Sequence, residues 1–274
     1  MATGISGATR VAAIIGDPVE HSRSPAIWNA AFAATGVDWI FVALPVPRGQ
    51  VPAALAGVRA LGIAALSVTM PHKSAAASEC DELTSTATRL GAVNSILAQD
   101  GRLLGDSTDG EGLVRALLDE GCTPDGQRCV VLGAGGAARA IALALGVAGA
   151  HVTVAARRSS AAESAAGLAP GGEACDLAAA TDAVAAASIV INATPLGMQG
   201  EDPPFDTTVL GPSHIVIDTI YPAETPLVSA ARTQGARAAT GLGMLVHQAA
   251  LSFVRFTGID APLEVMREAA SSPS

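Results

Sequence analysis

The chain has 274 residues, of which 50% are apolar, 15% are charged and 3% are aromatic, and its formal net charge is −9. This length suits one large domain or two modest ones, and the composition excludes a disordered chain, while the acidic balance argues against nucleic-acid binding. No uninterrupted apolar run reaches the ~18 residues that a membrane span requires, and the N-terminus has no apolar signal-peptide region, so we expect a cytoplasmic protein.

The first half of the chain alternates β-branched runs with Ala-rich segments. Periodicity predicts strands at 11–15, 41–46, 64–68, 93–97 and 102–104, and helices at 24–35, 51–61 and 108–120, with a further helix after Pro71. Ser24 is the expected cap of the first helix, Gly62 ends the second, and Asp100-Gly101 turns an antiparallel hairpin.

The second half repeats this alternation. Strands are expected at 130–132, 151–155, 189–192 and 215–218, and helices at 137–147, 159–168, 226–235 and 245–256. Strands that alternate with helices predict parallel sheets covered by helices on both faces. Two such series predict two α/β domains, with a first boundary near Asp109.

A glycine loop between a predicted strand and a predicted helix is the clearest chemical signal. Gly133, Gly135 and Ala138 satisfy G-x-G-x-x-G/A, which is typical of dinucleotide binding. Gly133 allows a tight turn and Gly135 lets the backbone approach a pyrophosphate. The N–H groups at the helix start, Gly136 and Ala137, would bind that group. A purely structural turn is the alternative.

The end of the next strand indicates which cofactor the loop binds. NAD sites usually carry an acid about 20 residues beyond the glycines, but here Arg157, Arg158 and Ser159 follow the strand, and the first acid is Glu163. Guanidinium groups bind phosphate by charge-assisted hydrogen bonds. The sequence therefore favours NADP(H) over NAD.

Six further segments stand out. They are GDPVEHSRSPAIWN (16–29), SVTMPHK (67–73), GAVNS (91–95), GDSTDG (105–110), NATPLGM (192–198) and GLGMLVHQAA (241–250). In this order, with the glycine loop between the fourth and the fifth, the set resembles the shikimate 5-dehydrogenase family over about residues 11–260. That family reduces 3-dehydroshikimate to shikimate with NADPH, on the route to aromatic amino acids.

The resemblance implies a particular architecture. Residues 1–109 and 242–274 would form a discontinuous substrate-binding domain with a mainly parallel sheet. Residues 110–241 would form a Rossmann-type NADP-binding domain, with an active-site cleft between the two. The expected partner is a small molecule, with no nucleic acid, membrane or metal, and the expected state is a monomer or homodimer.

The resemblance also implies roles for single residues. Lys73 and Asp109 match the catalytic pair: an ammonium group stabilises the charge that hydride transfer leaves on a ketone oxygen, and a carboxylate holds the lysine. Either residue could pass the proton. Residues matching the substrate site are Ser22, Ser24, Thr69, Asn94, Tyr221 and Gln248. Asn192, Thr194, Gly197 and Met198 match the nicotinamide side, and Gly243 and Met244, at the return to the first domain, match further cofactor positions.

Several positions depart from the usual family pattern. Trp28 replaces a usual His, Ser67 and Ser107 each replace a usual Asn, and A-R-R-S stands for N-R-T. Trp28 either adds bulk beside the substrate serines or packs in the core. Two alternatives therefore stay open: a paralogue acting on quinate or a related ring, and an NADP(H)-binding module without turnover.

Overall fold

The chain folds into two compact units in a computed structural model that describes residues 4–221 and 223–272. The first unit comprises Met1–Thr108 and Val246–Ser274, and the second comprises Asp109–Leu245. Each unit is built on one six-stranded sheet. Two α/β units with mainly parallel sheets confirm the predicted fold class.

The first unit has its sheet in the order β2-β1-β3-β5-β6-β4, and β5 alone runs against its neighbours. Its strands are β1 (Arg10–Gly16), β2 (Trp39–Pro45), β3 (Ala65–Val68), β4 (Glu82–Leu83), β5 (Ser95–Gln99) and β6 (Arg102–Asp106). Its helices are α1 (Ser24–Thr35), α2 (Val51–Leu61), α3 (Lys73–Ser78), α4 (Ser85–Leu90) and α11 (Leu263–Ser271), together with most of α10 (Leu242–Thr257).

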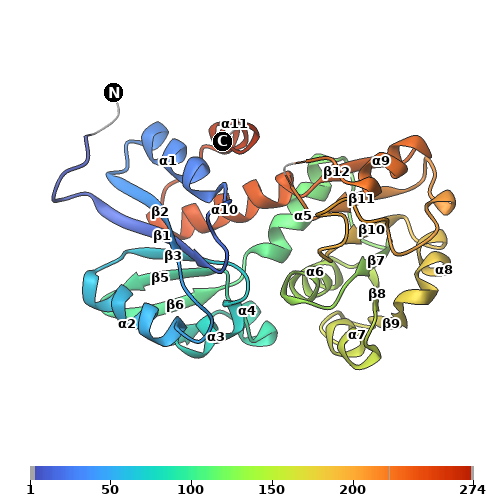
Figure 1. The fold of residues 1–274 in the computed structure, drawn as a ribbon, viewed down its shortest axis with the longest axis horizontal. Helices are drawn as coiled ribbons and strands as arrows, with labels where there is room; N and C mark the ends of the chain where they lie inside the picture. The colour runs from blue at the N-terminus through green and yellow to red at the C-terminus, as the bar shows by residue number, and fades with distance from the viewer. Residues whose placement is uncertain (1–3, 222, 273–274) are drawn as a thin grey trace. The chain divides into compact units, whose positions relative to one another are not determined.

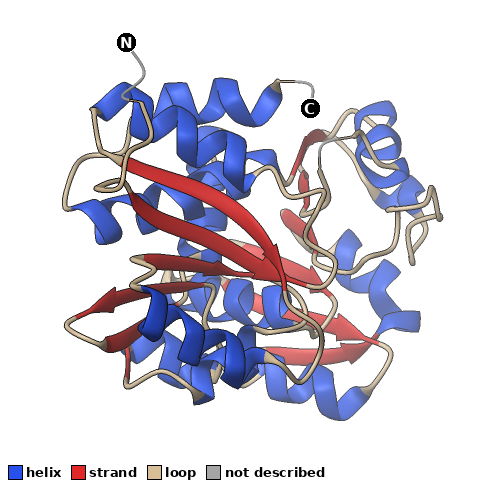
Figure 2. Cartoon of the chain, turned by 60° about the vertical axis from the view of Figure 1, so that its left-hand side comes forward, coloured by secondary structure: helices blue, strands red, loops and turns tan. Residues whose placement is uncertain are grey.

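Helices cover both faces of this sheet (Figures 1 and 2). The α1, α10 and α11 helices lie on one face, and α2 and α3 lie on the other (Figure 1). Strand β3 is buried along its whole length, and Leu55 of α2 packs with Ile15 and Leu66 in one hydrophobic core. Continuous apolar strands are expected where helices cover both faces of a sheet.

The second unit has a fully parallel sheet in the order β12-β11-β10-β7-β8-β9. Its strands are β7 (Arg128–Leu132), β8 (His151–Ala156), β9 (Glu173–Asp176), β10 (Ile189–Asn192), β11 (Ile215–Asp218) and β12 (Arg237–Thr240). Its helices are α5 (Asp109–Asp119), α6 (Gly136–Val147), α7 (Ser159–Ala166), α8 (Ala180–Ala185) and α9 (Pro226–Thr233), with 3₁₀ turns at Leu177–Ala179 and Thr207–Val209. Read from β9, this is the 3-2-1-4-5-6 order of the Rossmann fold, with its switch point between β7 and β10.

Two local predictions have different outcomes. The hairpin turn is confirmed, because Asp100 and Gly101 have φ angles of 51° and 77° between antiparallel β5 and β6. The predicted capping role of Ser24 is wrong. Arg23 occupies the cap position of α1 without a side-chain bond, and the backbone N–H of Ser24 donates to the Ser22 hydroxyl at 3.2 Å. Pro25 has no N–H to donate. The hydroxyl that accepts a hydrogen bond at the start of α1 therefore belongs to Ser22, which precedes the helix.

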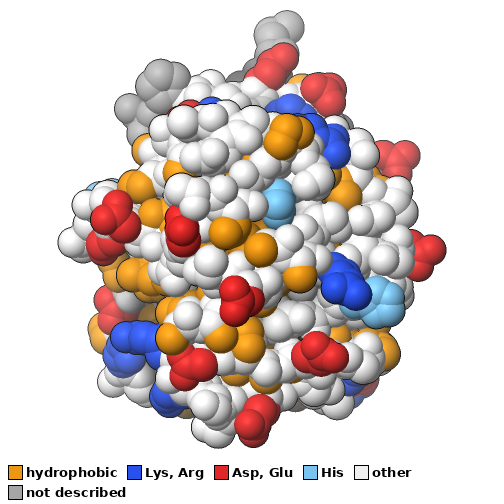
Figure 3. All heavy atoms as spheres, turned by 90° about the vertical axis from the view of Figure 1, so that its right-hand side faces the viewer, with side chains coloured by type: hydrophobic (Ala, Val, Ile, Leu, Met, Phe, Trp, Pro, Cys, Tyr) orange, Lys and Arg blue, Asp and Glu red, His pale blue; other side chains and the backbone are white. Residues whose placement is uncertain are grey.

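Surface charge and helix length bear on possible partners. On the face of the second unit in Figure 3, acidic and basic side chains are interspersed and apolar side chains lie between them. Among the described residues, no helix combines the length and apolar character needed to cross a bilayer.

The contact between α5 and α6 depends on a glycine. A Cβ atom on Gly110 would lie 2.3 Å from the carbonyl oxygen of Ala140 and 2.7 Å from Cβ of Ala144. We expect Gly110→Ala to lower the free energy of unfolding by about 1–3 kcal/mol, because the helices must separate. Gly57→Ala is the control: a Cβ there meets nothing within 4 Å, so a gain of about 0.5–1 kcal/mol is expected in α2. Urea unfolding measures both, and equal effects would contradict the packing argument.

Candidate active site

The predicted substrate residues of the first unit follow one edge of its sheet. In the register, Ile15 lies opposite Val68, and Ser95 lies between Ser67 and Asp106. The carboxyl ends of β1, β3 and β6 therefore meet the amino end of β5. Ligands of open α/β sheets bind at the carboxyl ends of parallel strands, so this edge is the candidate substrate site.

Asn94 is the centre of a hydrogen-bond network at this edge. Its Nδ2 donates to the Thr108 hydroxyl at 3.0 Å and to Oε1 of Gln248 at 3.3 Å, and its Oδ1 accepts from the Thr108 N–H at 2.8 Å. The Thr108 hydroxyl also lies 3.1 Å from the carbonyl oxygen of Gln248 and 3.2 Å from the Ser252 hydroxyl. The structure thus brings together two predicted residues, Asn94 and Gln248, that are 154 positions apart.

Lys73 is the first residue of α3 and is half-buried. His72, before it, is buried with its Nε2 2.6 Å from the carbonyl oxygen of Val46, which anchors the helix start. The carbonyl oxygen of Lys73 accepts from the N–H of Val93, so the lysine backbone adjoins Asn94. Lys73 is also the only lysine in the sequence, whose other fifteen Lys and Arg residues are all arginines.

Asp109 is the first residue of α5 and is 6% exposed. It directly follows Thr108 in the chain, and the N–H and hydroxyl of Thr108 both form hydrogen bonds with Asn94. Lys73 falls in the first unit and Asp109 opens the second. The Asn94 network therefore fixes Thr108, the residue that directly precedes Asp109.

The remaining predicted residues of the first unit lie after β1 and β3. Ser24 is buried and Ser22 half-buried at the start of α1. Thr69 follows β3, and its N–H donates to the carbonyl oxygen of Ile15 at 3.0 Å. A Cβ on Gly16 would lie 2.4 Å from Cγ2 of Thr69, so the glycine permits this close approach of the two strand ends.

Two of the unusual residues can now be placed. Trp28 is fully buried and stacks on Phe41 and Phe256, with ring centroids 5.0 and 5.3 Å apart, so it packs in the core. Ser67 is 8% exposed and pairs across the sheet with the buried Ser95. Both serines are buried polar residues of the neighbouring strands β3 and β5, at the candidate substrate edge.

The cofactor residues of the second unit also follow one strand edge. Leu132 lies opposite both Asn192 and Ala155, and Asp218 lies between Asn192 and Thr240. Gly133 has a φ of 107°, and a Cβ there would lie 2.9 Å from the carbonyl oxygen of Ala193. The loop is therefore pressed against the end of β10 at the switch point.

The glycine loop fits a dinucleotide pyrophosphate. Gly135 occupies the cap position of α6, Gly136 begins the helix, and both are exposed. The first N–H groups of a helix lack intrahelical partners and attract anions. Ala138 is fully buried in the core, which agrees with its predicted packing role.

The predicted 2′-phosphate residues lie at the neighbouring strand end. Arg157 and Arg158 directly follow β8, Ser159 begins α7, and all three are exposed. Neither arginine forms an ion pair within the described part of the chain. Two exposed guanidinium groups beside the glycine loop are well suited to a phosphate.

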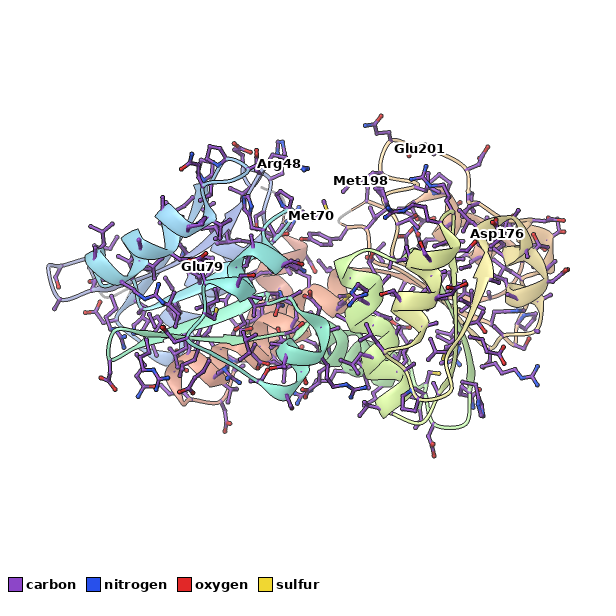
Figure 4. The ribbon with its side chains drawn as sticks, turned by 90° about the horizontal axis from the view of Figure 1, so that it is seen from below. Arg48, Met70, Glu79, Asp176, Met198 and Glu201 are labelled. Atoms are coloured by element: carbon purple, nitrogen blue, oxygen red, sulfur yellow. The ribbon has the colours of Figure 1, made fainter. Side chains whose placement is uncertain are left out.

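The segment after β10 forms a closed turn. Oδ1 of Asn192 accepts from the N–H and the hydroxyl of Thr194 at 3.0 and 2.7 Å, and its Nδ2 donates to the carbonyl oxygen of Leu196 at 3.0 Å. Beyond the turn, Met198 and Glu201 lie on one loop (Figure 4), where the Glu201 carboxylate accepts from the N–H groups of Gly197 and Gln199.

Three further predicted residues lie in the second unit. Tyr221 is half-buried after β11. Gly243 faces Ala116, because a Cβ on it would lie 3.2 Å from that side chain. Met244 is 8% exposed and packs in the hydrophobic core of the unit, so it presents little surface to a ligand.

Sequence reasoning overlooked several residues that support these sites. Thr108 and Ser252 complete the Asn94 network. Asp106 binds Arg255 at 2.7 Å, which ties the strand end before Thr108 to α10. Asp218 holds Asn192 at 3.0 Å. Thr108 and Asp106 lie inside the GDSTDG motif (105–110). Asp218 is a charged residue at the end of an apolar strand, so the sequence contains a signal for each of the three.

A hollow of about 570 Å³ occurs elsewhere in the second unit, lined in part by Arg128, His151 and Glu173. These residues begin β7, β8 and β9, whereas ligands of parallel sheets bind at the carboxyl ends. We therefore place the candidate site at the glycine loop. No group of three or more His, Cys, Asp or Glu in the described residues is arranged to hold a metal ion.

Comparison with known proteins gives matches over most of the chain. Residues 14–96 match the shikimate dehydrogenase substrate binding domain, and residues 241–270 match the shikimate 5'-dehydrogenase C-terminal domain. The chain is 44% identical to the shikimate dehydrogenase (NADP(+)) of Symbiobacterium thermophilum, with 96% of this chain and 94% of that protein covered.

Solved structures agree with this similarity. The shikimate 5-dehydrogenase of Thermus thermophilus in complex with NADP(H) and shikimate has a TM-score of 0.88 at 35% identity, covering 95% of this chain and 98% of that one. The quinate dehydrogenase of Corynebacterium glutamicum in complex with NAD has a TM-score of 0.88 at 31% identity, with 95% and 98% covered.

Proposed function

Because the chain belongs to the shikimate dehydrogenase family, we propose that it reduces 3-dehydroshikimate to shikimate with NADPH, in aromatic amino-acid biosynthesis. The observation that carries this proposal is the similarity to an NADP-dependent shikimate dehydrogenase over 96% of the chain, which includes both units. The exposed pair Arg157 and Arg158 at the end of β8 supports NADP rather than NAD.

In this proposal one unit binds the substrate and the other binds the cofactor. Residues 1–109 and 242–274 form the substrate-binding domain, and residues 110–241 form the NADP-binding domain. The compact units, Met1–Thr108 with Val246–Ser274 and Asp109–Leu245, support this division. The Rossmann strand order of the second unit supports its task as well.

The chemistry of the reaction assigns tasks to Lys73 and Asp109. NADPH supplies a hydride to the ketone carbon of the ring. The Lys73 ammonium stabilises the negative charge that develops on the ketone oxygen, and Asp109 orients the lysine and a ring hydroxyl. One proton then completes the alcohol, and it comes from this pair.

Polar side chains of the first unit orient the ring. Ser22 and Ser24 bind its carboxylate, and Thr69, Asn94 and Gln248 bind its hydroxyls, with Tyr221 contributing from the second unit. The Asn94 network supports this assignment, because it holds Asn94 and Gln248 side by side at the carboxyl edge of the sheet and fixes the orientation of the Asn94 amide. Preorganised donors lose little freedom on binding.

Cofactor contacts come from the second unit. Gly133, Gly135, Gly136 and Ala137 receive the pyrophosphate, and Arg157, Arg158 and Ser159 receive the 2′-phosphate. Asn192, Thr194, Gly197 and Met198 form the nicotinamide side, and Gly243 and Met244 are further cofactor positions at the return to the first domain. The fit of the glycine loop against Ala193 supports this arrangement.

Loss of NADPH absorbance in the presence of 3-dehydroshikimate tests the proposed function. We expect rapid NADPH oxidation and slow NADH oxidation. Oxidation of quinate with NAD, but no turnover of shikimate, would instead assign the chain to the quinate branch that the Corynebacterium glutamicum similarity represents. Binding of NADPH with no turnover of any of these ring compounds would show that the chain is an NADP(H)-binding module without enzymatic activity.

The cofactor preference depends on two cations. We expect Arg157→Ala and Arg158→Ala each to raise the KM for NADPH about tenfold or more, because a charge-assisted hydrogen bond contributes about 1.5–3 kcal/mol. The KM for NADH should not change, since NADH has no 2′-phosphate. Arg115→Ala is the control, because that exposed arginine pairs with Glu111 in its own helix. Equal changes for NADPH and NADH would refute the assignment.

The setting of the enzyme is part of the proposal. We propose a cytoplasmic monomer or homodimer that acts on small molecules without a nucleic-acid or membrane partner. All four cysteines are free thiols, which suits a reducing compartment, and burial raises the pKa of Cys129 to about 12. Light scattering of the purified protein would give its oligomeric state.

A further inference from the structure

Asp218 is a fully buried carboxylate at the carboxyl end of β11. Its Oδ1 accepts from Nδ2 of Asn192 at 3.0 Å and from the N–H of Ile220 at 3.1 Å, and its Oδ2 accepts from the Thr225 hydroxyl at 2.7 Å. The Thr225 hydroxyl also caps α9 by accepting from the N–H of Val228. None of the roles described so far uses this carboxylate as a charge.

The three partners favour the ionised form of Asp218. The Asn192 amide can only donate toward it, because Oδ1 of Asn192 already accepts from Thr194. The Ile220 N–H is a fixed donor, and the Thr225 hydroxyl, while it accepts from Val228, still has its own hydrogen to donate to Oδ2. Burial raises the pKa of Asp218 from its ordinary value, and the hydrogen bonds from Thr225, Ile220 and Asn192 act against that rise. The groups that donate hydrogen bonds to Asp218 are an amide, a backbone N–H and a hydroxyl, so these dipoles hold its charge.

The position of this charge gives it a function. The Rossmann fold binds a dinucleotide across two mononucleotide halves, and the β10–β12 half lies beyond the switch point from the glycine loop. Asp218 supports the turn after β10 through Asn192, and the register places their strand ends side by side. This half is the nicotinamide side of the proposed site.

We propose that Asp218 is a positioning residue with two effects: its hydrogen bond holds Asn192, and its negative charge sets the relative affinity for the two cofactor forms, favouring NADP⁺ over NADPH. The inference rests on the proposed function, because it needs a nicotinamide on this half of the sheet. The nicotinamide ring of NADP⁺ is positively charged and that of NADPH is neutral. A negative charge at this edge attracts only the first, whereas a purely structural role would affect both alike.

Asp218→Asn tests the charge with little change of shape. The amide oxygen can accept from Asn192 and Ile220 as Oδ1 does, and the amide nitrogen can donate to Thr225, which then accepts. Calorimetric titration of the full-length protein with NADP⁺ and, separately, with NADPH gives both dissociation constants. We expect the dissociation constant for NADP⁺ to rise about fivefold relative to that for NADPH, because at an effective dielectric constant of about 20 two unit charges about 17 Å apart interact by about 1 kcal/mol.

Two further variants serve as controls. Asp206→Asn removes an exposed carboxylate of the same unit, which accepts from the N–H and hydroxyl of Thr208, and should leave the ratio of dissociation constants unchanged. Thr225→Val keeps the charge of Asp218 and removes one donor, so it should lower stability and affect both affinities alike. The KM for 3-dehydroshikimate should stay the same in Asp206→Asn.

The outcomes separate the inference from the proposed function. A folded Asp218→Asn protein with the wild-type ratio overturns the inference, even if both affinities fall. Should that variant not fold, Asp218→Ser, in which water can reach the three donors, is titrated instead, and failure of both variants to fold would assign Asp218 to the fold alone. If the wild-type protein binds neither NADP⁺ nor NADPH, the proposed function itself fails.

Discussion

Lys73→Ala should lower kcat by about a thousandfold, with less than about 0.5 kcal/mol lost in stability. The side chain is half-buried at the start of a short helix, and the contact of its backbone with Val93 does not depend on the side chain. The loss should therefore appear in the chemical step. NADPH oxidation at saturating 3-dehydroshikimate measures kcat, and urea unfolding measures the stability.

Two comparisons make the Lys73 prediction specific. Lys73→Arg keeps a positive charge on a broader, planar group, and we expect it to recover only part of the rate. Arg102→Ala removes an exposed cation of the same unit, which pairs with Glu82 at the sheet edge, and turnover should not change. A Lys73→Ala protein with near-normal kcat would show that another group stabilises the oxygen.

Trp28→Ala should lower the free energy of unfolding by about 3–5 kcal/mol, the largest loss of stability that we expect from a single substitution here. Trp28 has no exposed surface, and the rings of Phe32, Phe41, Phe253 and Phe256 lie within 5.0–5.9 Å of it. Removing the indole would leave a cavity at the centre of the only large aromatic cluster recorded among the described residues. Urea unfolding, followed by circular dichroism, measures the loss.

The other tryptophan provides a control for this prediction. Trp39 is half-buried and stacks beneath the Arg10 guanidinium, 4.5 Å from its ring centroid, so Trp39→Ala should cost less than Trp28→Ala. Trp28→Phe should also cost less, because it keeps an aromatic ring and removes the buried Nε1, which has no partner in the described structure. A loss near zero for Trp28→Ala would mean that the cluster does not support the fold.

Signals that are local in sequence predicted local structure well. The glycine loop, the hairpin turn at Asp100-Gly101 and the strands ending at Asn192 and Asp218 each depend on a few adjacent residues. Short or polar elements were not predicted. Strand β4 has two residues, and β12 (Arg237–Thr240) has the sequence RAAT, in which no residue is fully buried, so neither shows an apolar run.

Contacts between distant segments set the limit for the candidate site. Thr108 meets Ser252 across 144 positions, and Asn192 meets Asp218 across 26. No periodicity or spacing connects such pairs, because sheet order and helix docking bring them together. The prediction that Ser24 caps α1 was wrong for a local reason. Ser22 and Ser24 both lie at the start of this helix, and only the backbone geometry around Pro25 decides which hydroxyl accepts a hydrogen bond there.

The position of Lys73 at the start of α3 has a practical consequence. Since Lys73 is the only lysine in the sequence, reagents that acylate primary amines have a single side-chain target, besides the terminal amine. Coupling through amines to a bead or a dye would consume the group that the reaction requires. The same uniqueness makes a protein grown on ¹⁵N-lysine show one ammonium resonance, which reports directly on the candidate catalytic group as ligands are added.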